Sequence, residues 1–366
     1  MSYPKKMQYV RLGTSGLKVS KIILGCMSYG EPAWSGGWVL GEEDTSKHIK
    51  AAYDAGINTF DTANAYSNGV SEEVLGRAIR QHNLPRDEIV VMTKVFIAVA
   101  RDPKQTLWDT VDLDAQGYVN QYGLSRKHIF DSVKHSLRRL GMDYIDVLQC
   151  HRFDPNTPIE ETMQALHDVV KAGYVRYIGM SSCYAWQFHA MQNYAVANKL
   201  TPFVSMQNQY SLIYREEERE MFPTLKHLGV GSIPWSPLSR GALSRPLSQE
   251  TKRGGTDVLP SSFYTQSAGS KTIVTRQVPF LVRHGVITRN TNTNNRVEEV
   301  AKKRGISMAQ VAVAWVISKD GVSAPIVGTT SLENLADIIG AIHVQLTEDE
   351  IKYLEEPYEP LPIFGH

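Results

Sequence analysis

The sequence predicts an α/β fold, a (β/α)8 barrel, in a single domain that spans residues 1–366. Three observations support this prediction. Eight short apolar runs recur along the chain, segments with helical periodicity separate them, and no linker or low-complexity tract divides the sequence. Such alternation is typical of a parallel sheet covered by helices. With 366 residues, 42% of them hydrophobic, the chain has enough apolar material for one large core.

The apolar runs are the predicted barrel strands. Several are almost continuously hydrophobic, as expected of parallel strands that are buried on both faces. Before them, Gly-Thr-Ser-Gly interrupts the β-prone segment Arg11–Lys21, which predicts a hairpin outside the barrel. The eight predicted strands are Ile22–Leu24, Thr59–Phe60, Ile89–Met92, Ile145–Leu148, Tyr177–Ile178, Phe203–Ser205, Gly231–Ile233 and Pro325–Val327.

Helix start signals stand between these strands. Thr157-Pro158-Ile159-Glu160 has the pattern of a capping box with proline at the first helical position. Ser307 and Ser331 each precede apolar residues at helical spacing. Two connections are long, Ala98–Tyr122 after the third strand and Ser239–Asn295 after the seventh. Long loops at the carboxyl end of a barrel usually cover or shape a site.

Composition narrows the classes of function. The formal net charge is +1, so neither a nucleic-acid nor an anionic-membrane partner is indicated, and nothing indicates an oligomeric state. The N-terminus lacks the apolar core of a signal peptide, and the most apolar stretch, residues 89–100, is too short to span a bilayer. Cys26, Cys150 and Cys183 have no paired spacing, so we expect no metal site and a reducing, cytoplasmic location. Cys150 is expected to be a buried structural residue rather than a nucleophile.

Four polar residues stand at or just beyond the ends of predicted strands: Asp61, Tyr66, Lys94 and His151. Taken singly, each has an ordinary structural explanation, such as a turn cap, a loop aromatic, a solvated strand end or a core histidine. A barrel would gather all four at one mouth. There they could protonate a carbonyl oxygen that a hydride has made negative.

The chemistry uses each side chain differently. A free tyrosine has a pKa of about 10 and is a slow acid near neutrality. A buried ammonium at Lys94 would lower the pKa of Tyr66, and Asp61 would keep Lys94 charged. A neutral His151 could donate a hydrogen bond that orients the carbonyl oxygen. An alternative for the same residues is a barrel aldolase that uses Lys94 as a Schiff-base nucleophile.

The segments Phe60–Ser67, Val91–Val95 and Leu148–Arg152 resemble motifs of the aldo-keto reductases. His151–Pro158 and Trp235–Gly241 resemble most closely the branch of aryl-alcohol dehydrogenase-like reductases and potassium-channel β subunits. The resemblance covers about Tyr9 to Leu346. It implies a nicotinamide cofactor bound without a Rossmann domain and the tetrad Asp61, Tyr66, Lys94 and His151. The channel-subunit likeness also permits a regulatory subunit with negligible turnover, although those subunits tend to have asparagine at the position of His151.

The resemblance also implies cofactor contacts. Ser181 and Gln207 match residues near the nicotinamide amide, and Ser182 stands at a position there where many relatives have asparagine. Trp235 matches the aromatic residue on which the nicotinamide stacks. The segment after Trp235 is expected along the pyrophosphate, and Asp337 matches an acidic residue near adenine. Ser331 could simply cap a helix there or help to hold phosphate. The full expected set is Cys26, Met27, Asp61, Ser181, Ser182, Gln207, Trp235, Ser236, Pro237, Leu238, Ser239, Arg240, Gly328, Thr330, Asn334 and Asp337.

Cofactor choice is where the chain departs from the family pattern. Gly328 and Asn334 stand where many NADPH-preferring members have lysine and arginine, and Ile338 replaces an asparagine. We expect NADPH, with Arg240 or Arg245 as partners for the 2′-phosphate, while NADH is possible. Aromatic or apolar aldehydes and ketones are the expected substrates. Their predicted contacts are Trp34, Trp38, Tyr66, Trp108 and His151.

Overall fold

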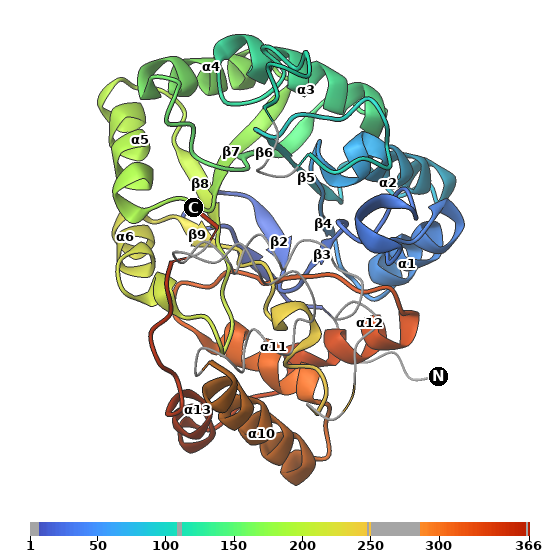
Figure 1. Cartoon of the computed structure of the whole chain (residues 1–366), viewed down its shortest axis with the longest axis vertical. Helices are drawn as coiled ribbons and strands as arrows, with labels where there is room; N and C mark the ends of the chain where they lie inside the picture. Colours follow the sequence, from blue (N-terminus) through green and yellow to red (C-terminus); the bar gives the residue numbers. More distant parts are fainter. Residues whose placement is uncertain (1–6, 108–111, 247–248, 250–285, 364) are drawn as a thin grey trace.

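The computed structural model describes residues 7–107, 112–246, 249, 286–363 and 365–366, which form the predicted α/β barrel (Figure 1). Its main sheet has eight parallel strands in the order β10-β3-β4-β5-β6-β7-β8-β9. All eight predicted strands are present, and most differences lie at their ends. The strands are β3 (Ile23–Gly25), β4 (Thr59–Asp61), β5 (Val90–Val95), β6 (Ile145–Cys150), β7 (Val175–Ser181), β8 (Phe203–Gln207), β9 (Gly231–Ser232) and β10 (Ile326–Val327).

The barrel closes between its first and last strands in this order. Ser323 N donates to Ser232 O at 2.8 Å, and Ile326 N donates to Pro234 O at 2.8 Å. These bonds join β10 and the segment before it to β9 and the residues after β9. The closed sheet therefore has few free backbone groups along an edge, which is the usual advantage of a barrel.

The predicted N-terminal hairpin is confirmed as β1 (Tyr9–Arg11) paired antiparallel with β2 (Lys18–Ser20). Leu12 and Val19 belong to the same buried apolar cluster as Val90, Met92 and Val147 of the barrel strands. The hairpin thus packs against the interior at the amino ends of the strands. Burial there leaves the opposite, carboxyl end as the place for polar residues.

Helices surround the sheet (Figure 1). Adjacent helices contact one another from α1 to α6, and α12 returns to α1. The α-helices are α1 (Glu42–Asp54), α2 (Val70–Gln81), α3 (Arg126–Leu140), α4 (Ile159–Lys171), α5 (Ala185–Ala197), α6 (Met221–Leu228), α10 (Val286–Arg304), α11 (Met308–Ser318), α12 (Leu332–Ile339) and α13 (Glu348–Glu355). Short 3-10 helices are η1 (Trp34–Gly36), η2 (Tyr66–Gly69), η3 (Glu216–Glu218), η4 (Ser239–Gly241) and η5 (Gly340–His343).

Two of the three predicted helix caps are confirmed. The hydroxyls of Ser307 and Ser331 accept the amide hydrogens that begin α11 and α12. The capping box at Thr157 is wrong, because Pro158 is the N-cap residue of α4 and makes no side-chain cap. The Thr157 hydroxyl instead donates to Asp154 Oδ2 at 2.7 Å. The charged carboxylate of Asp154 is a strong hydrogen-bond acceptor, and the capping pattern at Thr157 did not indicate this contact.

The two long connections differ from each other. Asn68 holds the connection after β5: its Nδ2 donates to Gln105 O at 2.6 Å and its Oδ1 accepts from Ala100 N at 2.9 Å. The connection after β9 was predicted too long, because α10 already begins at Val286. Residues 247–248 and 250–285 lie outside the described part. Among the helices that are described, none combines the length and apolarity needed to cross a bilayer.

Candidate active site

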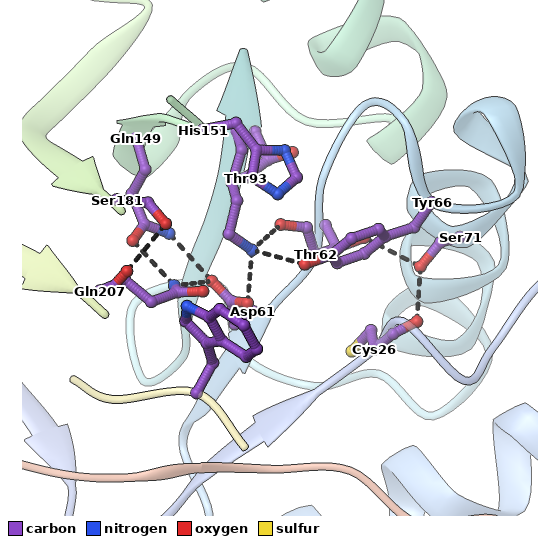
Figure 2. Close-up of polar contacts among 12 residues, drawn as sticks. Cys26, Asp61, Thr62, Tyr66, Ser71, Thr93, Gln149, His151, Ser181 and Gln207 are labelled. Carbon is purple, nitrogen blue, oxygen red and sulfur yellow. Dashed lines mark hydrogen bonds and ion pairs between the residues drawn. The ribbon is translucent and has the colours of Figure 1, made fainter. Parts of the chain in front are cut away.

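The structure brings the four predicted catalytic residues together at the carboxyl ends of neighbouring strands. Figure 2 labels Asp61, Tyr66 and His151 among them. Asp61 is the last residue of β4, Lys94 lies within β5, His151 directly follows β6, and Tyr66 begins η2. Strand side chains alternate between the two faces of the sheet. Val91 and Val95 belong to the large buried apolar cluster between the sheet and the surrounding helices, the helix-facing core, so Lys94 points the other way, into the barrel.

Lys94 is the centre of the cluster and is fully buried. Its Nζ lies 2.6 Å from Asp61 Oδ2, 2.9 Å from Thr62 O and 3.2 Å from Tyr66 Oη. An ammonium has three hydrogens to donate, and each of these atoms can accept one. Lys94 is therefore satisfied within the site as a cation.

Burial and charge act against each other in this cluster. Burial favours the neutral amine, but Asp61 and Tyr66 outweigh it and raise the pKa of Lys94 above its usual value. For Tyr66, burial is the largest influence and raises the pKa of the phenol, while Lys94 lowers it. Lys94 therefore acts on the pKa of Tyr66 in the expected direction, which is downward. The expectation of a lowered pKa for Tyr66 is wrong in net direction, because the phenol loses its water on burial.

His151 stands against the ring of Tyr66. Their ring centroids are 5.8 Å apart and the rings are nearly perpendicular, at 83°. Burial, followed by the charges of Arg152 and Lys94, holds the pKa of His151 well below its usual value. The imidazole is therefore neutral near pH 7. Its Nδ1 atom is buried and has no hydrogen-bond partner among the described residues.

The second oxygen of Asp61 has two amide donors. Gln149 Nε2 lies 2.9 Å and Gln207 Nε2 3.0 Å from Asp61 Oδ1. Gln207 was an expected cofactor residue, whereas Gln149 was assigned no role. The sequence held a signal for Gln149: it lies on β6, two residues before His151, which directly follows that strand, so alternation turns both side chains into the barrel.

Other residues expected near the nicotinamide lie beside this group. Ser181 and Ser182 are buried at the end of β7, and Ser181 Oγ donates to Gln207 O at 2.8 Å. Trp235, which follows β9, donates from Nε1 to Ser182 Oγ at 3.2 Å. Hydroxyl, amide and indole groups therefore converge from three neighbouring strands.

The segment after Trp235 has an unusual backbone. The φ values of Ser236, Ser239 and Arg240 are 54°, 47° and 57°. These values lie in the left-handed region that residues other than glycine rarely adopt. Leu238 packs against the helix-facing core, and Pro237 is buried. Left-handed residues often turn successive amide groups towards one concave surface, which suits an anion.

The N-terminus of α12 is open to solvent. Gly328, Thr330 and Asn334 are exposed. Ser331 caps the helix by accepting from Asn334 N at 3.3 Å. Asp337 lies one turn further on, where its Oδ2 accepts from Ser307 Oγ at 2.6 Å. Asp337 thus also joins α12 to the start of α11.

The remaining expected residues lie near Tyr66 or cannot be placed. Trp34, Trp38 and Tyr66 form one small buried cluster, against which Met27 packs. Trp34 is only 1% exposed, so it can support a pocket wall from behind but not form its surface. Cys26 is buried, and its carbonyl oxygen accepts from Ser71 Oγ at 2.8 Å. Trp108 lies outside the described residues. No cluster of three or more metal-ligating side chains lies in the described part of the chain.

Comparisons with known proteins agree with this geometry. The model of the aldo/keto reductase family matches residues 21–359. The Schizosaccharomyces pombe protein named "Putative aryl-alcohol dehydrogenase C977.14c" is 49% identical, covering 98% of this chain and 97% of that protein. The versiconal hemiacetal acetate reductase of Aspergillus parasiticus is 47% identical, covering 98% of each chain. The aldo-keto reductase AMT2 of Alternaria alternata is 44% identical, covering 98% of this chain and 93% of that protein. The chain therefore belongs to the aldo/keto reductase family and is an NAD(P)H-dependent oxidoreductase.

Proposed function

We propose that the protein reduces apolar or aromatic aldehydes and ketones to alcohols with NADPH, and that Tyr66 donates the proton. One observation carries this proposal: a buried, charge-paired Lys94 lies 3.2 Å from the phenolic oxygen of Tyr66. A cationic donor at that distance stabilises the phenolate that remains after proton transfer. His151, neutral and adjacent to the phenol, completes a site for a carbonyl oxygen.

The residues divide the reaction between them. When bound, a reduced nicotinamide would supply the hydride that the carbonyl carbon accepts. Tyr66 Oη gives its proton to the carbonyl oxygen as negative charge develops there, so the product is a neutral alcohol. Lys94 stabilises the resulting phenolate, and Asp61 holds Lys94 in place. His151 orients the carbonyl oxygen by a hydrogen bond. A proton from solvent then restores the phenol.

The chemistry of the donor set supports a nicotinamide cofactor. Ser181, Ser182 and Gln207 offer hydroxyl and amide groups for a carboxamide, and Trp235 offers an indole face for the ring. Preference for NADPH rests on Arg240, because a 2′-phosphate favours a guanidinium partner. Replacing Arg240 with Ala should weaken NADPH binding about tenfold and leave NADH binding almost unchanged. Equal weakening of both cofactors would contradict this assignment.

The apolar cluster beside Tyr66 supports the substrate class. Trp38 and Tyr66 pack together with Trp34 behind them. Aromatic side chains bury apolar rings favourably but offer little to the hydroxyl groups of a sugar. We therefore expect benzaldehyde-type substrates to be preferred over aldoses.

A kinetic panel tests the function directly. NADPH oxidation is followed with 4-nitrobenzaldehyde, with benzaldehyde and with aldoses, and NADH replaces NADPH in a parallel series. The proposal requires steady turnover of the aromatic aldehydes and a higher kcat/KM for them than for aldoses. Binding of NADPH without turnover of any carbonyl would instead indicate a regulatory, cofactor-binding subunit. Equal efficiency with both groups would refute only the aromatic preference.

The aldolase alternative needs a neutral amine at Lys94, but Asp61 and Tyr66 raise the pKa of this lysine. A Schiff-base nucleophile must lose its proton before it attacks a carbonyl. Borohydride treatment with a carbonyl compound and no nicotinamide should therefore leave the protein mass unchanged. An adduct on Lys94 would favour the aldolase.

Two broader expectations accompany this proposal. We infer one domain, because the family match spans residues 21–359 without a break, and this predicts one cooperative unfolding transition. We also infer a cytoplasmic location, because all three cysteines are free and buried. Fluorescence microscopy of a tagged chain would test it, and a secretory distribution would contradict it.

A further inference from the structure

The carboxylate of Asp61 is held on both sides (Figure 2). Its Oδ2 atom faces the ammonium of Lys94 at 2.6 Å, while Oδ1 accepts from the side-chain amides of Gln149 and Gln207. Asp61 is only 2% exposed, so water does little to solvate Oδ1. A buried carboxylate oxygen needs donors, and the two amides supply them.

Asp61, Gln149 and Gln207 each contact the other two, and Gln149 uses both polar atoms of its side chain to do so. Its Nε2 donates to Asp61 Oδ1 at 2.9 Å, and its Oε1 accepts from Gln207 Nε2 at 2.9 Å. The carboxylate can only accept, so the Gln149 amide nitrogen must face Asp61 and its oxygen must face Gln207. Both polar atoms are therefore used, and the orientation of the side chain is determined.

The barrel register explains why a long side chain fits here. Lys94 pairs with Gln149 across β5 and β6, and Gln149 pairs with Gly179 across β6 and β7. Gly179 has no side chain to fill the space beside Gln149. A Cβ atom on Gly179 would lie 3.2 Å from Gln149 Cγ and 2.3 Å from Ser205 Oγ. The glycine thus leaves room in the barrel for the amide chain.

We infer that Gln149 is a positioning residue of the active site, which holds the Asp61 carboxylate and the Gln207 side chain in one hydrogen-bonded set. The inference deepens the proposed function and rests on it. Gln207 belongs to the nicotinamide side of the site, and Asp61 fixes the lysine that contacts Tyr66. Gln207 also contacts Asp61 directly, and Gln149 holds both of these side chains in place, so it supports the cofactor side and the proton-donating pair together. It acts through its neighbours and need not touch the substrate.

The first test replaces Gln149 with Leu in the full chain. Leu keeps similar bulk but removes both hydrogen bonds. We expect about tenfold weaker binding of NADPH, measured by fluorescence titration without any carbonyl, and about tenfold lower kcat/KM. The matched control is Gln192→Leu, since Gln192 is a buried glutamine on α5 whose amide bonds both backbone polar groups of Phe203. Its cofactor affinity should stay within about twofold of wild type.

The second test uses Gln149→Glu, which is nearly the same size. A protonated Glu can still donate to Asp61 Oδ1, but an ionised one cannot and adds a like charge. Activity relative to wild type should therefore fall as pH rises from about 6 to 9. Gln149→Leu should lose the same fraction at every pH. The fall should appear in kcat/KM of the folded protein, whereas a purely structural role would lower the free energy of unfolding at high pH and leave kcat/KM of the folded protein unchanged.

The outcomes separate the two proposals. If Gln149→Leu binds NADPH as wild type does, or if the Glu variant shows no pH-dependent loss, the positioning role is wrong. If the wild-type protein reduces no carbonyl compound, the proposed function fails. NADPH affinity in the Leu variant and in the Gln192→Leu control still decides the role of Gln149.

Discussion

The two ends of the barrel interior are lined by the same strands but bury different kinds of side chain. At the amino end, Val90 and Met92 of β5 meet Val147 and the hairpin residues Leu12 and Val19 in an apolar cluster. At the carboxyl end, Lys94 lies two residues beyond Met92 and meets Asp61 and Tyr66. One end buries methyl and methylene groups, and the other buries charge.

This difference separates the amino end, which stabilises the fold, from the carboxyl end, which carries the chemistry. Apolar burial stabilises the fold by about 25 cal/mol per Å² and requires no specific partner. A buried ion pair contributes little net stability, because desolvation offsets the attraction, but losing one partner is costly. The amino end can therefore tolerate changes of apolar shape. The carboxyl end depends on the identity of each group.

Tyr66→Phe should have the largest effect on activity. It removes the acidic proton but keeps the ring, so kcat/KM should fall by about 10²–10⁴-fold while NADPH affinity stays nearly unchanged. Turnover of 4-nitrobenzaldehyde and a cofactor titration measure the two quantities. The matched control is Tyr118→Phe, because Tyr118 is buried in the loop after β5 and accepts from Arg101 N. Full activity in Tyr66→Phe would exclude the proposed proton donor.

Lys94→Met should affect both activity and stability. The apolar side chain cannot stabilise a phenolate, so turnover should fall about as far as in Tyr66→Phe. It also leaves the Asp61 charge buried without a cation, which should lower the free energy of unfolding by about 3–5 kcal/mol. Denaturant unfolding at pH 7 measures this loss. Unchanged stability would contradict the dependence of the Asp61 carboxylate on a cationic partner.

Met92→Ala tests the apolar end of the same strand. Met92 is fully buried. Its truncation should lower the free energy of unfolding by about 2–5 kcal/mol. The cavity created by this truncation would lie on the amino-end side of the Lys94–Asp61 ion pair, so kcat should change by less than about twofold. A large loss of kcat at a temperature where the variant is folded would show that the two ends are coupled.

The smallest expected effect is the pH dependence from His151. Burial lowers the pKa of His151 in the folded state, whereas the unfolded chain has a pKa of about 6.5. The unfolded state therefore binds the proton more readily, and stability falls as pH decreases below about 6.5. At pH 5 this loss should reach about 2 kcal/mol. Chemical unfolding of wild type and His151→Phe from pH 5 to 8 measures it, and parallel curves would contradict the assignment.

Much of the fold could be predicted because its signals are local. A strand that is buried on both faces must be apolar along its length, so the eight apolar runs predicted the eight strands. Ser307 and Ser331 marked helix starts because a cap bonds an amide only three residues away. Asp61 and Lys94 could be placed in one site because parallel strands end at the same side of a barrel.

The tertiary structure determined the contacts between residues that are distant in the sequence and the burial of each side chain. Burial, which arises only in the assembled fold, outweighs Lys94 in setting the pKa of Tyr66. Gln149 meets Gln207, 58 positions away in the sequence, only because β6 and β8 lie on either side of β7. Periodicity therefore determined which residues face the barrel interior. Distances and desolvation, which arise only when the strands assemble, determined which of them act together.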